Sequence, residues 1–250
     1  MRSPAPTRRL IDLVVANALF RLPITARKRL FAGQEAFCPI CETHISGFLT
    51  LHRPYHRWCP VCRSLQRHRL TWLFLKRHGL LTAYEPQTML HFAPEPGLAM
   101  RLARVPTLRY ITVDLTQPTM VRVDIINLPF RDNEFDSILC SHVLEHVPRD
   151  EQAMRELYRV LKPSGVAVIL VPIKGKQTIE DPSITDSILR ERYFGQFDHV
   201  RVYGRDVVQR LQQAGFSVTL VTAQDIVQHQ ADIAWMGLPT QETIFVCRKG

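Results

Sequence analysis

The sequence has no long apolar run and no recognisable export signal. Its 250 residues contain no uninterrupted apolar stretch near the roughly 18 residues of a membrane-spanning helix. Arg2, Arg8 and Arg9 precede an apolar segment, but no small-residue cleavage site follows it. The sequence therefore predicts a protein without a transmembrane span and a cytoplasmic location.

Acidic residues are scarce in the first third of the chain. The whole chain has a net charge of +9, yet residues 1–80 contain fourteen Lys/Arg against three Asp/Glu, and the remainder contains eighteen against twenty. This asymmetry favours an anionic partner such as RNA, another polyanion or a membrane surface. A solvated basic face is the alternative, because charge alone does not name a partner.

Cysteine is sparse outside one short region. Of six cysteines, four fall within residues 38–62 as two Cys-x-x-Cys pairs, namely Cys38 with Cys41 and Cys59 with Cys62. This spacing is typical of a zinc ribbon, in which four thiolates surround one ion and leave no position for substrate. We therefore predict a structural zinc ion. An iron–sulfur cluster and four ordinary thiols remain as alternatives, and disulfides are disfavoured in a reducing compartment.

The loop between the two cysteine pairs mixes cations with aromatic rings. Its residues 52–58 read HRPYHRW. Such a mixture can contact phosphates and stack on nucleic-acid bases, or it can cover the apolar side of the ribbon. The sequence does not choose between the two.

Three sections are predicted along the chain. Residues 1–36 form a basic amphipathic segment, with Leu10, Leu13, Val14 and Ala18 at helical spacing, that packs on the main domain or makes a peripheral membrane contact. Residues 37–80 hold the zinc ribbon and a basic helix over 64–78. Residues 86–250 form the main domain.

Strands alternate with helices in the main domain. Strands are predicted over 89–93, 110–114, 121–125, 135–141, 166–171, 216–221 and 243–247, with helices over 150–161 and 205–214. The run Pro163-Ser164-Gly165 is expected to end the first of these helices. This pattern predicts an α/β fold with a doubly wound, mostly parallel seven-stranded sheet.

Two motifs beside the fourth and fifth strands carry a family resemblance. They read FDSILCSHVLEHV at 135–147 and LYRVLKPSG at 157–165. Both resemble class I S-adenosylmethionine-dependent methyltransferases of the type 11 group. Residues 37–248, with LHFAPE at 90–95 and FGQFDHV at 194–200, resemble a bacterial subgroup that carries two Cys-x-x-Cys pairs ahead of the cofactor domain. The resemblance implies a Rossmann-like methyltransferase fold and S-adenosyl-L-methionine as cofactor.

The resemblance also implies where the cofactor binds. In open α/β sheets, ligands lie beyond the carboxyl ends of the strands. The acid Asp114 follows the first strand by about twenty residues, the distance expected for a carboxylate that accepts ribose hydroxyls. The predicted cofactor-binding residues are His91, Phe92, Ala93, Glu95, Asp114, Leu115, Asp124, Ile125, Ser141 and His142.

The loop after the first strand lacks the glycines and the acid that the family usually has there. His91 stands in the acid position, and Ala93, Glu95 and Gly97 stand in the glycine positions. Pro94 and Pro96 also remove backbone donors. Glu95 is then a candidate partner for the cofactor's ammonium group, and a degenerate, inactive pocket is the alternative.

The sequence predicts a methyltransferase that acts on an oxygen or nitrogen atom of a small-molecule or sugar-containing acceptor. His142, His146 and His199 are the candidate bases, and a structural hydrogen bond is the alternative role for Glu145 and His146. Residues 172–204 are predicted to cover the acceptor. One alternative function is an rRNA or tRNA methyltransferase whose basic ribbon binds RNA, and another is a zinc-ribbon binding protein with an inactive methyltransferase domain.

Overall fold

A computed structural model describes residues 18–50, 57–81 and 85–250. The chain divides into two compact units, each built from separate stretches of sequence. Unit 1 comprises the described residues within 1–82, 95–106 and 222–241, and unit 2 those within 83–94, 107–221 and 242–250. The predicted domains 1–36, 37–80 and 86–250 are continuous in sequence, whereas these units interleave. The predicted amphipathic stripe lies almost wholly outside the described residues.

Unit 2 is built on a seven-stranded sheet with the order β12-β13-β9-β8-β5-β6-β7. Strand β13 is antiparallel to both of its neighbours, and the strands from β9 to β7 run parallel. The predicted mostly parallel, seven-stranded α/β sheet is therefore confirmed. The strands are β5 (Gln87–Phe92), β6 (Leu108–Asp114), β7 (Val121–Arg122), β8 (Phe135–Ser141), β9 (Leu161–Leu170), β12 (Ser217–Val221) and β13 (Ile244–Arg248).

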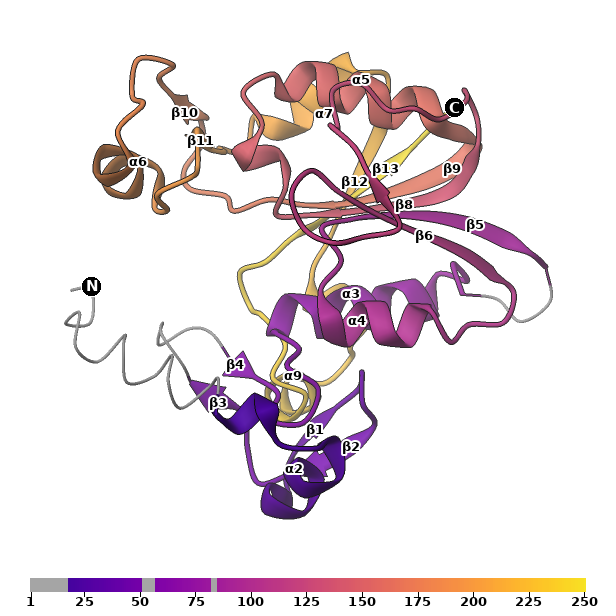
Figure 1. Ribbon diagram of the computed structural model, residues 1–250, viewed down its shortest axis with the longest axis vertical. Coiled ribbons are helices and arrows are strands. Elements are labelled where there is room, and N and C mark those ends of the chain that lie inside the picture. The colour runs from indigo at the N-terminus through magenta and orange to yellow at the C-terminus, as the bar shows by residue number, and fades with distance from the viewer. Residues whose placement is uncertain (1–17, 51–56, 82–84) are drawn as a thin grey trace. The chain divides into compact units, whose positions relative to one another are not determined.

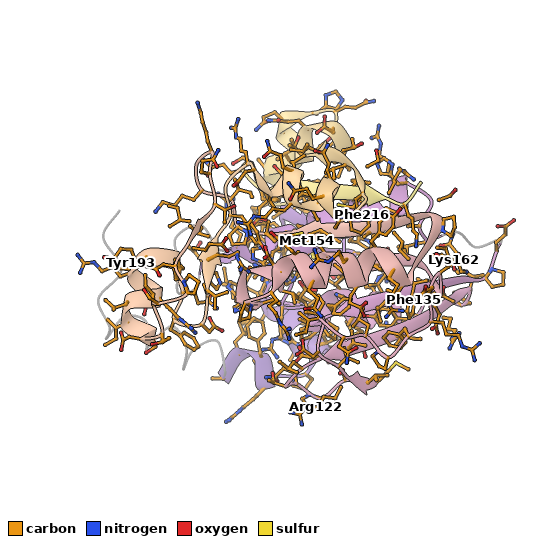
Figure 2. The ribbon with its side chains drawn as sticks, turned by 90° about the horizontal axis from the view of Figure 1, so that it is seen from above. Arg122, Phe135, Met154, Lys162, Tyr193 and Phe216 are labelled. Atoms are coloured by element: carbon orange, nitrogen blue, oxygen red, sulfur yellow. The ribbon has the colours of Figure 1, made fainter. Side chains whose placement is uncertain are left out.

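Helices α5 (Asp150–Val160) and α7 (Val207–Gln213) pack on this sheet, where Figure 1 shows them on the same face. Figure 2 looks onto α5, whose Met154 is buried in one core cluster with Phe135 and Phe216. The apolar positions of α5 recur every three to four residues, so one side of the helix is buried and the other is solvated. The α5 face therefore forms much of the core of unit 2.

A separate segment lies at the edge of unit 2 where the parallel strands end. It contains the short 3₁₀ turn η1 (Leu144–His146), the strand pair β10 (Ile179–Glu180) and β11 (Arg201–Val202), and helix α6 (Ser187–Phe194). In Figure 2, Tyr193 on α6 lies at the opposite end of the unit from Lys162, near the start of β9. Residues 179–202 therefore lie beyond the carboxyl ends of the sheet.

The end of α5 differs from the prediction. The helix stops at Val160 and β9 begins at once with Leu161, so the Pro163-Ser164-Gly165 run falls inside the strand. Ser164 has a φ of +62° and its N–H donates to the Lys249 carbonyl at 2.9 Å. This pairing with the chain's end keeps the bulged segment in the sheet. The predicted strand 121–125 is also shorter, because β7 ends at Arg122.

Unit 1 contains short elements around the cysteine pairs. They are α2 (Ile24–Leu30), β1 (Ala32–Cys38), β2 (Thr43–Ile45), β3 (Leu49–Thr50), β4 (Arg57–Trp58), α3 (Gln66–Arg77), α4 (Pro96–Leu102), α8 (Ala223–Ile226) and α9 (Gln230–Trp235). The first Cys-x-x-Cys pair lies at the turn between β1 and β2, and the second directly follows β4, which pairs with β3. Among the described residues, no helix combines the length and apolar character needed to cross a bilayer.

Candidate active site

A cleft opens in unit 2 beyond the ends of β5, β6 and β8. Its volume is about 700 Å³, within the range usual for small-molecule and cofactor sites. Strand β5 lies between β6 and β8, so chain connections leave it in opposite directions and a crevice forms at its end. The lining residues are Phe92, Ala93, Val113–Thr116, Val123–Ile126, His142, Val143, His146–Arg149 and Asp198.

Two carboxylates stand on the wall of this cleft. Asp114 ends β6, and its Oδ1 accepts the backbone N–H groups of Thr116 and Gln117, both at 2.7 Å. Asp124 follows β7, and its Oδ1 accepts the Ile126 N–H at 3.2 Å. In each case one oxygen fixes the local turn, and the other oxygen accepts no hydrogen bond from the described residues. These second oxygens can accept hydroxyl or amino donors from a bound molecule.

The loop after β5 turns sharply at Ala93. This residue has a φ of +48°, a conformation that a glycine would adopt without strain, and its N–H donates to the Val113 carbonyl at 2.9 Å. In unit 1, Pro96 is the first residue of helix α4, where its missing N–H costs no hydrogen bond. A Cβ on Gly97 would lie 2.7 Å from the Cys62 carbonyl oxygen. Gly97 is therefore needed for close packing against a cysteine turn of unit 1.

Two of the predicted cofactor residues make other contacts. The side chain of His91 is buried, and its Nδ1 lies 2.6 Å from the hydroxyl of Tyr110. Glu95 belongs to unit 1, where its Oε1 lies 3.2 Å from Nε2 of His68. Burial lowers the pKa of His68, and the Glu95 carboxylate counters part of that shift. Neither His91 nor Glu95 lines the cleft.

His142 begins the segment after β8 and turns the chain toward the cleft. Its φ is +55°, and its N–H donates to the Leu170 carbonyl at 2.8 Å. Its Nδ1 lies 3.1 Å from Oε1 of Glu145, and its Nε2 lies 3.7 Å from Oε2 of Glu242. The imidazole therefore lies between two carboxylates.

The other two candidate bases contact each other. The rings of His146 and His199 meet edge to face, with 4.7 Å between their centroids. His146 lines the cleft, whereas His199 is buried behind it. Burial lowers the pKa of His199, partly offset by the nearby Glu145 carboxylate, so its neutral form is favoured.

The four ribbon cysteines converge in unit 1. Their sulfur atoms all lie within 4.8 Å of one another, with 3.6 Å between Cys38 and Cys62 and 3.7 Å between Cys41 and Cys59. A disulfide requires about 2.05 Å, so these are not disulfide pairs. A tetrahedral ion with bonds of about 2.3 Å would separate its sulfur ligands by about 3.8 Å. The cluster therefore fits a single tetrahedral metal ion.

A buried arginine organises the surroundings of this cluster. Arg69 on α3 donates to the carbonyls of Ser64 at 2.9 Å, Met236 at 2.8 Å and Gly237 at 2.6 Å. Burial lowers the pKa of Arg69, and the nearby cysteines oppose the shift. Arg69 thus joins helix α9 to the ribbon within unit 1, and it is a structural residue rather than part of an exposed basic patch.

Comparison with known proteins identifies the domain around the cleft. Residues 90–169 match the family model described as a methyltransferase domain. Residues 90–169, about a third of the chain, therefore form a methyltransferase domain. The matched residues include the last half of β5, all of β6, β8 and α5, and nearly all of β9, and thus the strand ends that form the cleft.

Two curated relatives match over short segments. The uncharacterized protein MJ0638 of Methanocaldococcus jannaschii is 38% identical over 74 residues, which is 30% of this chain and 28% of the relative. A demethylmenaquinone methyltransferase of Staphylococcus saprophyticus is 44% identical over 59 residues, or 24% and 25% of the two chains. The matched part therefore spans about a quarter of each relative.

Among solved structures, this chain is similar to the [4+2]-cyclase SpnF, with a TM-score of 0.55 and 18% identity. The similarity covers 100% of this chain and 99% of the SpnF chain. That similarity shows the fold alone.

Seven of the ten predicted cofactor residues line the cleft of the methyltransferase domain. They are Phe92, Ala93, Asp114, Leu115, Asp124, Ile125 and His142. Ser141 is buried at the end of β8 and, like His91 and Glu95, is not among the lining residues. Glu145, a candidate base with a structural hydrogen bond as its alternative role, is fully buried between His142 and the two other histidines. The motif around His146 drew attention to Glu145, but a sequence motif does not show whether a side chain is buried.

The basic and aromatic loop between the cysteine pairs is described only in part. His52, Arg53, Tyr55 and His56 lie outside the described residues. Trp58 lies on β4, and its ring centroid is 6.2 Å from that of Phe20. The choice between packing and nucleic-acid contact therefore stays a prediction for this loop.

Proposed function

We propose that this protein transfers a methyl group from S-adenosylmethionine to an oxygen or nitrogen atom of a small-molecule or sugar-containing acceptor. One observation carries the proposal: seven predicted cofactor residues, from three strand ends and the segment after β7, line a single cleft in a domain of the methyltransferase family. Residues so distant in sequence converge in this way when an open α/β sheet binds a ligand at its carboxyl edge.

The side chains of the cleft suit an adenosyl ligand. Oδ1 of Asp114 holds the turn at Thr116, which leaves its other oxygen to accept the ribose hydroxyls. Asp124 is placed to accept the adenine amino group, while Val113, Ile125 and Ile126 offer apolar walls for the ring. When bound, the cofactor supplies a sulfonium-linked methyl group. The protein's part is to align the acceptor with that methyl group and to exclude water.

His142 is the proposed general base. It lines the cleft, and the buried carboxylate of Glu145 lies 3.1 Å from its Nδ1. A nearby carboxylate stabilises the imidazolium that forms when Nε2 accepts a proton. His146 also lines the cleft and is a second candidate. His199 is a weaker candidate, because it is buried and its Nδ1 lies 3.2 Å from the Phe194 carbonyl.

The segment 172–204 is the proposed acceptor wall. Asp198, which lies in this segment, lines the cleft, and several apolar side chains of the segment are exposed. They are Ile173, Ile179, Ile188, Leu189, Tyr193 and Phe197. Exposed apolar residues in a segment that reaches the cleft favour an acceptor with an apolar part, which would cover some of them when bound.

A structural zinc ion is proposed for the cysteine cluster. Four thiolates at the observed spacing match the ligand number and geometry of structural zinc sites and leave no open position. In unit 1 the ion would hold two short hairpins that have little apolar core of their own.

RNA is the second candidate acceptor, favoured by the exposed cations of the N-terminal third. Within its described residues, these are Arg21, Lys28, Arg29, Arg57, Arg63, Lys76 and Arg77, whereas Arg27 and Arg69 are buried. RNA affinity that falls steeply with salt would support this acceptor. Salt-insensitive or absent RNA binding would leave the small-molecule acceptor.

The deciding experiment measures both cofactor binding and methyl transfer. Calorimetry with S-adenosylhomocysteine should show saturable binding, and a screen of metabolite and RNA pools should release S-adenosylhomocysteine above the rate without acceptor. His142→Ala should lower turnover by about 10²–10⁴-fold, whereas the exposed His229→Ala should leave it unchanged. Absence of any cofactor binding would instead indicate a binding protein with an inactive domain.

A further inference from the structure

Three ligand-type side chains meet beside the cleft, and the proposed transfer reaction does not need all of them. Glu145 and His146 belong to η1, and His199 lies between α6 and β11, all in unit 2. One ligand atom from each lies within 4.8 Å of the other two. The two segments are joined by a hydrogen bond from the Val200 N–H to the Glu145 carbonyl at 2.9 Å. The backbone therefore fixes the three side chains relative to one another.

Glu145 brings a buried carboxylate into this cluster. Its side chain is 0% exposed, and neither of its oxygens accepts a hydrogen bond from any described residue. Nδ1 of His142 is 3.1 Å from Oε1, but the contact lacks the geometry of a hydrogen bond. Burying a carboxylate without hydrogen bonds is unfavourable, so such a group normally has a cation next to it.

The two histidines are oriented as metal ligands usually are. Nδ1 of His199 lies 3.2 Å from the Phe194 carbonyl oxygen, and Nδ1 of His146 lies 3.4 Å from Oδ2 of Asp198. Asp198 is held in turn by Gln196, whose Nε2 donates to Oδ1 at 2.9 Å. An imidazole that donates from Nδ1 carries its lone pair on Nε2, and a carbonyl or carboxylate behind the ring is the common outer contact of a metal-binding histidine.

We propose that Glu145, His146 and His199 bind a divalent transition-metal ion at the wall of the cleft. Two imidazoles and one carboxylate suit zinc, cobalt and related first-row ions rather than calcium or magnesium. Three protein ligands leave at least one position open to water or another ligand. The cysteine cluster, by contrast, offers four ligands and no open position.

The ion can also act on the methyl acceptor, an inference that rests on the proposed function. His146 also lines the cleft, so the open position can face a bound acceptor. A metal-bound hydroxyl loses its proton more readily than a free one. With the ion bound, His146 and His199 serve as ligands, and His142 is then the remaining candidate base.

The test is a cobalt titration of the full-length protein with zinc retained on its cysteines. Cobalt bound by imidazole and carboxylate gives weak visible bands, without the intense charge-transfer bands of cobalt thiolate. We expect saturable binding of one equivalent. His146→Ala should abolish it, and Asp198→Asn should weaken it about tenfold or more through the outer contact. His229→Ala, an exposed histidine of unit 1, is the matched control and should bind as the wild type does.

Three results would overturn the proposed metal site. They are no cobalt binding, cobalt binding that survives His146→Ala, and thiolate bands that place cobalt on the cysteines. Glu145→Gln, which keeps the shape of the buried side chain, provides a second variant if His146→Ala does not fold, and it should also weaken binding. If the protein bound cobalt but not S-adenosylhomocysteine, the result would support the metal site and contradict the proposed function.

Discussion

At the scale of single residues, Asp114 is the side chain on which cofactor affinity should depend most. Asp114→Asn keeps Oδ1, which holds the turn at Thr116 and Gln117, but replaces the other oxygen by an N–H donor. Hydrogen bonds to a charged group are worth about 1.5–3 kcal/mol. We therefore expect S-adenosylhomocysteine to bind about 10–100-fold more weakly in calorimetry.

Asp132→Asn is the matched control for this variant. Asp132 is exposed, contacts Arg159 and does not line the cleft. Its affinity for S-adenosylhomocysteine should equal that of the wild type. Equal affinity for Asp114→Asn as well would show that Asp114 does not contact the ribose.

The predicted cofactor residues that line the cleft lie at or just after the end of a strand. Asp114 is the last residue of β6 and His142 directly follows β8, so the apolar strand alone indicates where each side chain lies. His91 and Glu95 could not be placed in this way. Their positions are decided by Tyr110 and His68, which are distant in sequence and show no pattern that links them to their partners.

At the scale of elements, Asp136 joins three strands at their amino ends. Its Oδ2 accepts the N–H and hydroxyl of Thr88 on β5, and its Oδ1 accepts Lys162 on β9 at 2.8 Å. Burial acts to raise the pKa of Asp136, but the hydrogen bonds from Lys162 and Thr88 outweigh it, so the pKa lies below its usual range.

The lowered pKa predicts how acid acts on this link. The stabilisation is present above the unfolded-state pKa of about 3.9 and is lost as pH falls through the lower folded-state value. Asp136→Asn should therefore lower the free energy of unfolding by about 1 kcal/mol at neutral pH, measured by urea titration. The difference from wild type should shrink below about pH 4. A difference that is constant with pH would mean that the charge of Asp136 is not involved.

The segment 179–202 depends on a buried ion pair network. Arg201 is 4% exposed and contacts Glu180 at 2.8 Å and Asp150 at 3.4 Å. Arg201→Ala would leave buried Asp150 with fewer partners, so we expect a loss of about 3–5 kcal/mol in unfolding free energy. Arg155→Ala removes an exposed pair with Glu151 and should cost at most about 1 kcal/mol. Similar losses for the two variants in urea titrations would contradict this role for Arg201.

Sequence predicted the long elements better than the short ones. The strands β5, β6 and β8 and helices α3 and α5 fall close to their predicted ranges, because each carries a clear apolar run or helical period. Helices α4, α8 and α9 have four to seven residues each, too few to show a period. The link of Pro163–Gly165 to the chain's end was equally invisible, because it depends on a residue more than eighty positions away.

At the scale of the whole molecule, the two units draw on interleaved stretches of the chain. Helix α4 follows β5 in sequence but belongs to unit 1, as do α8 and α9 near the other end. Arg69 contributes to this arrangement within unit 1, where it binds the carbonyls of Met236 and Gly237. Local patterns cannot predict such a division, because it depends on contacts between residues more than 150 positions apart.

This division predicts a selective response to metal removal. All three tryptophans, Trp58, Trp72 and Trp235, lie in unit 1. Unit 1 contains the cysteine cluster, whereas the large apolar core around Met154 belongs to unit 2. Because metal binding by four thiolates supplies folding free energy directly, a strong chelator should shift tryptophan emission to longer wavelength. The far-UV circular dichroism from the sheet of unit 2 should largely persist.

The measurement is best made on the His146→Ala variant. That variant lacks the proposed second metal site, so the tryptophan signal follows the ribbon ion alone. Re-addition of zinc should restore the original emission, because the cysteines are reduced and can bind again. If chelation removed the metal and left tryptophan emission unchanged, unit 1 would hold its structure by its own packing. The cysteine cluster would then contribute little to folding, despite its tetrahedral spacing.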